Sequence, residues 1–280
     1  MNRVAIFGVG LIGGSFALAL RKAGFQGEIA GNSSPRTIAS ALKLGVIDRQ
    51  IGSDEAVETC DLLYLSQPII TILSTLEKIG PRIRPGTLVT DAGSTKRLIV
   101  EKAIGFVRQG IFVGGHPMAG KERSGVEEAD ADLFKGRTYV LTPCGSDDLG
   151  RPESAEFCDW IVKIGARPVV LEPDAHDRLV AYTSHAPQLL STALASVLAD
   201  VNGSASVAGP GVLGLTRLAM SPFGVWRDIL LTNQQHIDEA MAALMGKLSE
   251  LRGQISSASM EAEFERAGAA AKFLKENQRG

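Results

Sequence analysis

The feature that most constrains this chain is a glycine-rich turn that begins at its eighth residue. Gly8, Gly10 and Gly13 form a GxGxxG pattern that follows an apolar run at 4–7 and precedes a helix-like segment. The first glycine of such a pattern permits a tight turn, the second lets the backbone approach a pyrophosphate, and the third lets the helix pack closely against a sheet. The anion then lies over the helix N-terminus, where free N–H groups favour negative charge. We therefore expect dinucleotide contacts from Gly8, Gly10, Leu11, Ile12 and Gly13.

Apolar runs alternate with helical segments from the glycine turn to about residue 173. This alternation is typical of a doubly wound parallel sheet, that is, of an α/β Rossmann fold. From Asp174 onward helical periodicity takes over, which predicts two domains: a dinucleotide-binding domain at 1–173 and an all-helical substrate and dimerisation domain at 174–280. The expected strands are 4–7, 28–31, 61–66, 87–91, 111–114, 137–142 and 167–171, and the expected helices before residue 173 are 15–23, 37–44, 69–79 and 154–164.

The helical part carries its own signals. Asp174 and Asp177 are expected to serve as the cap and first-turn acid of a long helix, and Pro187 is expected to kink that helix, because proline removes a backbone hydrogen bond. Further along, apolar residues recur at steps of four and three, which indicates either a seam between two subunits of a homodimer or a helix pair within one chain. This stripe consists of Ile237, Met241, Leu244, Leu248, Leu251 and Ile255.

Composition excludes several classes of protein. A net charge of −2 gives no electrostatic hold on nucleic acid or on an anionic membrane. The run at 4–20 is uncharged but contains four glycines and falls short of the roughly 20 apolar residues that span a bilayer. Three widely spaced cysteines form neither a metal-binding pattern nor a disulfide framework, so we expect reduced thiols, a cytoplasmic location and no metal.

The end of the second expected strand bears on the choice of cofactor. A carboxylate there would hold the ribose hydroxyls of NAD, but the chain has Asn32, Ser33, Ser34 and Arg36 instead. Hydroxyls beside an arginine suit a 2′-phosphate, so this loop favours NADP. The alternative is NAD, with Arg36 a solvated residue at the start of a helix. Further cofactor contacts are expected from Ser66 and Pro68.

His116 differs from the other three histidines of the chain because paired glycines precede it in a GGHPMAG loop. A histidine exposed on such a loop, with an ordinary pKa near 6.5, suits proton removal at neutral pH. Ser94 follows the strand at 87–91 and should lie at the carboxyl edge of the sheet, where it either assists His116 or caps a helix that begins near Thr95. We expect His176 to have a local structural role and His236 to face solvent.

The chain resembles the prephenate and arogenate dehydrogenases of tyrosine biosynthesis over nearly its whole length. The matching segments are GVGLIGGS at 8–15, DAGSTK at 91–96, GGHPMAGKERSG at 114–125, SHAPQ at 184–188 and LTRLAMSPFGVWRDI at 215–229. This resemblance implies oxidative decarboxylation of a small-molecule substrate by a nicotinamide cofactor, with His116 as the base and Ser94 assisting it. It also implies that Arg217 binds a substrate carboxylate and that Trp226 walls the pocket.

One departure from the family pattern concerns the tail of the substrate. His185 matches the first histidine of the family segment, but Gln188 stands where many prephenate-using members have a second one. Glutamine donates hydrogen bonds but carries no charge, which leaves prephenate and arogenate both open as substrates. His185 and Gln188 are therefore candidate substrate-binding residues.

Two other interpretations are weaker. A β-hydroxyacid dehydrogenase or imine reductase would normally place a catalytic lysine on the long interdomain helix, and no lysine occurs between 174 and 199. A nucleotide-sensing module without catalysis would have no need for His116, Ser94 and Arg217 together.

Overall fold

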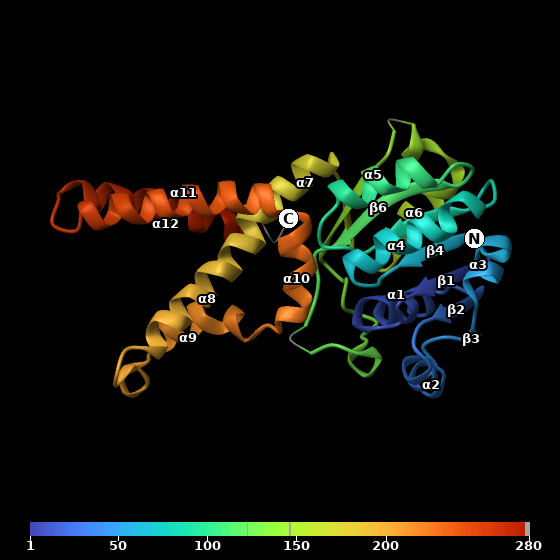
Figure 1. The fold of residues 1–280 in the computed structure, drawn as a ribbon, viewed down its shortest axis with the longest axis horizontal. Coiled ribbons are helices and arrows are strands. Elements are labelled where there is room, and N and C mark those ends of the chain that lie inside the picture. Colours follow the sequence, from blue (N-terminus) through green and yellow to red (C-terminus); the bar gives the residue numbers. More distant parts are fainter. Residues whose placement is uncertain (122, 146, 278–280) are drawn as a thin grey trace.

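An eight-stranded sheet forms the first half of the molecule, and long helices extend away from it (Figure 1). The computed structural model describes residues 1–121, 123–145 and 147–277. The strands lie in the order β3-β2-β1-β4-β5-β6-β7-β8, of which the first six match the usual Rossmann order. Their bounds are β1 Arg3–Phe7, β2 Glu28–Asn32, β3 Arg49–Gln50, β4 Leu62–Leu65, β5 Leu88–Asp91, β6 Ile111–Pro117, β7 Thr138–Pro143 and β8 Arg167–Val170.

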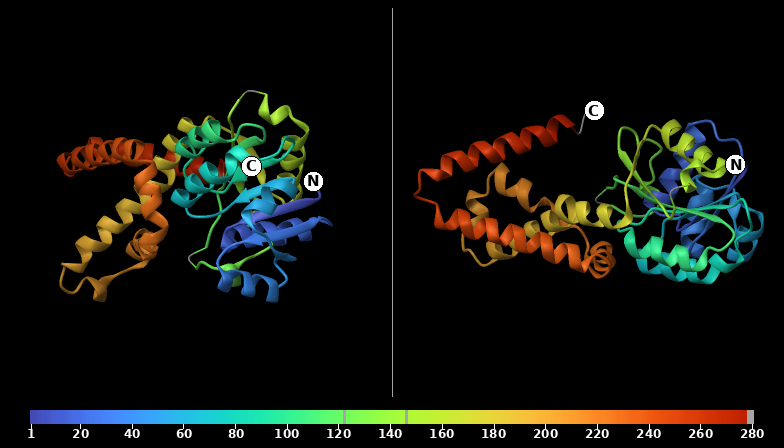
Figure 2. Two further views of the ribbon diagram at one scale, coloured as in Figure 1. Left: turned by 45° about the vertical axis from the view of Figure 1, so that its right-hand side comes forward. Right: turned by 90° about the horizontal axis from the view of Figure 1, so that it is seen from above.

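Helices cover both faces of this sheet, so the strands are buried on both sides (Figure 2). Alternate residues of β1 show this: Val4 and Ile6 join one apolar cluster, while Ala5 and Phe7 join the other. The predicted Rossmann fold is therefore confirmed. The helices of this part are α1 Leu11–Lys22, α2 Pro35–Lys43, α3 Ser53–Thr59, α4 Ile69–Ile79, α5 Arg97–Phe106 and α6 Pro152–Lys163.

The sheet departs from the expected all-parallel arrangement at β7. This strand runs antiparallel to β6, with His116 opposite Val140, whereas β8 is parallel to β7. Parallel neighbours need a crossover connection, usually a helix. The connection from β6 to β7 contains only a short 3-10 turn, Val126–Glu128, among its described residues. The prediction that β7 is parallel to β6 was wrong. The sequence between these strands shows no local pattern that reveals the lack of a crossover helix.

The long helix after the sheet is continuous but changes its winding. Helix α7, Pro173–Val180, passes through a π-helical turn, Ala181–His185, into α8, Ala186–Ala199. The π-helical turn lies immediately before Pro187, where the sequence predicts a kink. A wider turn relieves the crowding that a proline ring imposes on the carbonyl one turn earlier.

The remaining helices form two arms. Helices α11 and α12 diverge as a V when seen from above (Figure 2, right), and no residue of α12 is buried. The predicted stripe on α11 is buried at Ile237 and exposed at Leu248, and Ile255 lies beyond the end of the helix. Within the described residues, no helix has both the length and the hydropathy to cross a membrane. The bounds are α9 Pro210–Thr216, α10 Phe223–Thr232, α11 Gln234–Gly253 and α12 Ser259–Asn277.

Candidate active site

A cavity of about 550 Å³ lies where the sheet meets α10. Its walls come from the glycine turn between β1 and α1, the loops that follow β4, β5 and β6, and the start of α10. These five segments are represented by Gly10, Ser66, Ser94, Gly120 and Trp226. Segments far apart in the sequence thus converge at the carboxyl edge of the parallel strands, where ligands bind in such folds.

The glycine turn has the geometry that a dinucleotide requires. Gly8 has a φ of +90°, a conformation that side chains disfavour, and a Cβ on Gly13 would lie 2.3 Å from the carbonyl oxygen of Gly8. A Cβ on Gly10 would meet nothing within 4 Å, so the backbone is open to a ligand there. Gly10 also precedes α1 without a side-chain cap, which leaves the first N–H groups of this helix available to an anion. Leu11, Ile12 and Ser66 line the adjoining cavity.

A second hollow of about 480 Å³ continues from the glycine turn toward α2. Its lining includes Ser33 and Arg36, as expected, together with Pro68. The side chains of Asn32 and Ser34 are engaged elsewhere. The Asn32 amide donates to the carbonyl of Ile51 over 2.9 Å, and the Ser34 hydroxyl accepts from the backbone N–H of Thr37 at the start of α2.

One carboxylate in this hollow was not anticipated from the sequence. Glu127, in the connection between β6 and β7, lines it opposite α2. Hydrogen bonding within its own residue and to Ser40 lowers the pKa of this exposed side chain, and Arg36 acts in the same direction. No local signal pointed to Glu127, because it reaches α2 only through the fold.

His116 lies within β6 and not on a glycine-rich loop as predicted. Gly114 and Gly115 precede it in the strand, where a Cβ on Gly114 would lie 2.2 Å from Thr142 Oγ1 and one on Gly115 would lie 2.4 Å from the carbonyl oxygen of Asp91. The glycines therefore let neighbouring strands pack closely, which fixes the backbone of His116. Its side chain is half-buried.

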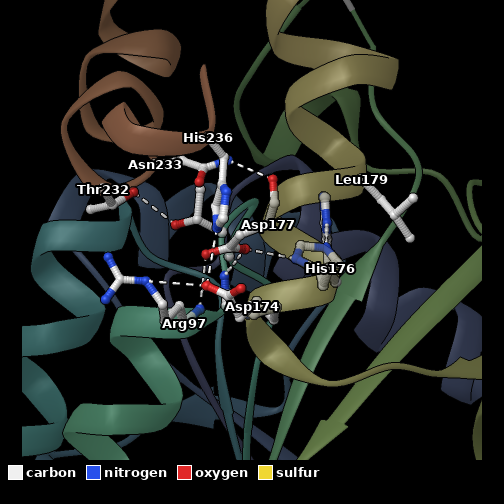
Figure 3. Close-up of polar contacts among 12 residues, drawn as sticks. Arg97, Asp174, His176, Asp177, Leu179, Thr232, Asn233 and His236 are labelled. Atoms are coloured by element: carbon white, nitrogen blue, oxygen red, sulfur yellow. Dashed lines mark hydrogen bonds and ion pairs between the residues drawn. The ribbon is translucent and has the colours of Figure 1, made fainter. Parts of the chain in front are cut away.

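One ring nitrogen of His116, Nδ1, already contacts another side chain. His116 Nδ1 lies 2.8 Å from Nε2 of His176, and His176 Nδ1 lies 2.8 Å from Oδ1 of Asp177. His176 and Asp177 are buried on α7 (Figure 3). The expectation that His176 has only a local role is therefore incomplete. A histidine followed by an aspartate was the available signal, but its partner lies 60 residues away in the chain.

A buried lysine fixes the loop that carries Ser94. Lys96 Nζ donates to Asp91 and, over 2.8 Å, to the carbonyl of Gly115, and both charged side chains are fully buried. Asp91 in turn accepts the backbone N–H groups of Gly93 and Gly115. These contacts hold the loop after β5 against β6, so that Ser94 and the strand bearing His116 keep a fixed relation.

Ser94 lines the large cavity and does not cap a helix. Helix α5 begins at Arg97, and the backbone N–H groups of Lys96 and Arg97 donate to the carboxylate of Asp177 over 2.6 and 2.9 Å. Asp177 thus caps a helix of the sheet domain and not its own helix α7, for which the sequence predicted it to be a terminal acid. Asp174 lies in the first turn of α7, whose N-cap position is Glu172.

The surroundings of His116 favour its neutral form. Burial, followed by the neighbouring His176 and Lys96, holds the pKa of His116 well below its ordinary value. A neutral imidazole at neutral pH is able to accept a proton, which is the chemistry that the residue type suggested.

The four candidate substrate-binding residues lie in different settings. Trp226 lines the large cavity and packs edge-on against His185, with ring centroids 5.9 Å apart. Gln188 donates from its amide to the carbonyl of Leu218 over 2.9 Å, while its Oε1 is buried without a partner among the described residues. Arg217 is exposed on a short 3-10 segment and is not among the residues that line the large cavity.

His236 is buried and does not face solvent as predicted. It belongs to α11, is 7% exposed, and its Nε2 lies 3.0 Å from Oδ1 of Asp174 (Figure 3). Nearby, the hydroxyls of Thr95 and Thr232 lie 2.8 Å apart, and the amide of Asn233 donates to the carbonyl of Asp177. The contact between Thr95 and Thr232 joins the helical part to the sheet domain beside the candidate site, whereas the other two tie α7 to the start of α11.

Comparison with known proteins gives a consistent family. Residues 16–170 match the family model described as "Prephenate dehydrogenase, nucleotide-binding domain", and residues 172–267 match "Prephenate dehydrogenase, dimerization domain". The prephenate dehydrogenase of Lactococcus lactis subsp. cremoris is 32% identical over 94% of this chain and 73% of its own length. The cyclohexadienyl dehydrogenase of Zymomonas mobilis is 27% identical over 91% of this chain and 89% of its own length.

Solved structures agree with this result. The prephenate dehydrogenase of A. aeolicus, in complex with hydroxyphenyl propionate and NAD+, has a TM-score of 0.87 and 30% identity, covering 99% of this chain and 98% of the other. Synechocystis arogenate dehydrogenase has a TM-score of 0.81 and 27% identity, covering 98% and 99% of the two chains. With two family models spanning most of its length and a relative above 30% identity, the chain belongs to the prephenate dehydrogenase family.

Proposed function

We propose that this protein catalyses the oxidative decarboxylation of prephenate with a nicotinamide cofactor, in the synthesis of tyrosine. The observation that carries this proposal is the placement of His116 at the end of β6, which Lys96 and Asp91 tie to the loop of Ser94. Ser94 in turn lines a cavity that continues into the glycine turn. The family and the ligands named for the A. aeolicus structure support the same reaction.

The residues present fit a dinucleotide. The open backbone at Gly10 and the uncapped N-terminus of α1 would hold its pyrophosphate, and the hollow lined by Ser33 and Arg36 would hold its adenosine end. When bound, the nicotinamide ring supplies the acceptor for the hydride.

His116 is the base in this proposal and Ser94 assists it. His116 accepts the proton of the substrate's ring hydroxyl as hydride leaves the same carbon. The bond to the ring carboxylate then breaks, its electron pair enters the ring, and CO2 departs. The aromatic product needs a proton on its oxygen, which the His116 imidazolium returns.

Arogenate is a second candidate substrate, which the side-chain oxygen of Gln188 favours because it has no partner among the described residues. Its Oε1 accepts hydrogen bonds, so it suits the ammonium group of an amino acid better than the carbonyl oxygen of a keto acid. Arg217 would hold a substrate carboxylate with its guanidinium fork, and Trp226 would form a wall of the pocket.

The test is an absorbance assay at the reduced-nicotinamide band with prephenate and with arogenate, each paired with NAD and NADP. Turnover of either substrate that His116→Asn reduces by about 10²–10⁴, at nearly unchanged cofactor binding, is the expected result. Folded protein that binds cofactor but turns over none of the four pairs would overturn the proposal.

We further propose that NADP is preferred to NAD, because no carboxylate follows β2 and Arg36 lines the adenosine hollow. Arg36→Ala should lower kcat/KM for NADP by about 10- to 100-fold, the equivalent of one charged hydrogen bond, and should leave that for NAD nearly unchanged. Glu127→Gln removes the carboxylate that opposes a 2′-phosphate and should raise the ratio of NADP to NAD. A preference for NAD in the unaltered protein would contradict this choice.

A homodimer formed through the helical part, 174–280, completes the proposal. The match to a dimerisation domain and the exposed apolar residues of α8 to α12 support it. Sedimentation of the purified protein tests it, and a monomer at micromolar concentration would exclude it.

A further inference from the structure

Asp177 is arranged as a hydrogen-bond acceptor at both carboxylate oxygens. Its Oδ1 accepts the backbone N–H of Lys96 over 2.6 Å and faces His176 Nδ1 at 2.8 Å, while its Oδ2 accepts the backbone N–H of Arg97 over 2.9 Å. The backbone N–H groups can only donate. The carboxylate that caps α5 therefore requires a proton on His176 Nδ1.

The proton on His176 Nδ1 in turn determines which nitrogen of His116 carries a proton. A neutral imidazole carries one N–H and one acceptor nitrogen. With Nδ1 of His176 protonated, its Nε2 must accept, so the N–H in the 2.8 Å contact belongs to Nδ1 of His116. The remaining nitrogen of His116, Nε2, is then the unprotonated one.

We propose that His176 and Asp177 are positioning residues, which hold His116 in the tautomer whose Nε2 accepts the substrate proton. This inference rests on the proposed role of His116 as the base. The proton taken from the substrate makes His116 an imidazolium, whose Nδ1–H stays bonded to His176 while the Asp177 carboxylate lies at the far end of the chain of bonds. A carboxylate that orients and stabilises a catalytic histidine is a recurrent device in hydrolases; here a second histidine stands between the two.

The surroundings of the pair make its arrangement rigid. His176 and Asp177 are both fully buried, and the backbone carbonyl of Asp177 accepts the amide of Asn233 over 2.7 Å. Asp177 lies on α7 in the helical part (Figure 3), and His116 and the capped helix α5 belong to the sheet domain. The tautomer of the base is thus set by the docking of one part on the other.

The tautomer itself is measurable by 15N NMR of the full-length protein with labelled histidine. The chain has four histidines, so single substitutions assign every signal. The expected result is a protonated Nδ1 and an unprotonated Nε2 for His116 at neutral pH, which reverts to a mixture in His176→Gln. A His116 ring that carries its proton on Nε2 in the unaltered protein would overturn the proposal. This readout does not depend on turnover, so it separates failure of the inference from failure of the proposed reaction.

Kinetics test the same chain of bonds. His176→Gln keeps the carboxylate cap on α5 but breaks the contact between the two imidazole rings. It should lower kcat by about 10- to 1000-fold, which is part of the rate gain that a general base provides, and should leave KM nearly unchanged. Asp177→Asn added to the His176→Gln variant should lower kcat little further, because both residues act through His116. In the Asp177→Asn single variant the acid limb of the kcat profile should move to lower pH, because the imidazolium loses a stabilising charge.

Asp174→Asn is the matched control. This acid lies on the same helix and bonds His236, but it takes no part in the contact with His116. Its kcat should stay near that of the unaltered protein. Normal kcat in His176→Gln, or losses that multiply fully in the double variant, would contradict the positioning role.

Discussion

The sheet domain and the helical part differ in how far they bury their own apolar side chains. The sheet has large apolar clusters on both faces, in which residues such as Phe16, Tyr64 and Phe112 are almost fully buried. The described helical part from α7 onward has one cluster of four buried residues, three of which are alanines. The first region is stabilised by its own core, whereas the second is not.

Large apolar side chains remain exposed on the helical arms, and their exposure explains how this part differs. Monomeric proteins rarely present so much apolar surface without a partner, so we infer that a second copy covers it. His176 on α7 contacts His116, so the candidate base touches the same part of the molecule that carries these exposed residues. The exposed residues on α8 to α12 include Val197, Leu213, Leu215, Met245, Phe264 and Phe273.

The largest expected effect comes from a core phenylalanine of the sheet domain. Phe16 is fully buried, and its ring stacks on Tyr64 with centroids 4.0 Å apart. Phe16→Ala should lower the free energy of unfolding by about 3–5 kcal/mol. Trp160 fluorescence in a Trp226→Phe background follows unfolding of this region in urea. A loss below about 1 kcal/mol would contradict the self-contained core.

Acid should weaken the helical part by the next largest amount. Burial lowers the pKa of His185 to about 4 from an ordinary value of 6.5. The unfolded chain therefore takes up a proton first as pH falls, so the stability from neutral His185 is complete above pH 6.5 and is lost as pH falls toward 4. The full loss corresponds to about 3 kcal/mol. Trp226 fluorescence in a Trp160→Phe background measures it, and His185→Asn should remove this part of the pH dependence.

The smallest effect on stability is expected from a phenylalanine on α12. Its substitution is also the most direct test of the difference between the sheet domain and the helical part. Phe264 is 71% exposed, so Phe264→Ala should change the stability of the separate chain by less than about 0.5 kcal/mol. If a second copy covers this ring, the same change should weaken the dimer by about 1.5–3 kcal/mol per ring buried. Sedimentation over a dilution series gives the dissociation constant. An unchanged constant would place Phe264 outside the interface.

Local patterns accounted for the elements that depend on local backbone geometry. The glycines at 8, 10 and 13 predicted the turn after β1, although α1 begins at Leu11 and not at residue 15 as expected. The helix predicted at 69–79 matches α4 in both bounds. Helix α3 and strand β3 were not anticipated, because short elements of mixed composition lack a clear period. The boundary between residues 173 and 174 stays a prediction.

The errors concern contacts between distant segments. His236 was expected to face solvent, but α11 packs it against Asp174. Asp177 was expected to serve its own helix, but its carboxylate caps α5. Each error follows from the same cause, since the partner of a polar side chain is decided by packing and not by its neighbours in sequence.

By itself the sequence determined the Rossmann fold, the dinucleotide turn and the candidate roles of His116 and Ser94, because residue type and spacing carry those signals. Only the tertiary structure decided that His176 links Asp177 to His116, that Lys96 and Asp91 fix the loop of Ser94, and that Glu127 reaches the hollow lined by Ser33 and Arg36. The contact between His116 and His176 joins segments 60 residues apart, and its geometry exists only after the helical part has docked on the edge of the sheet. The contacts of Lys96 and Glu127 exist only after the sheet domain has folded.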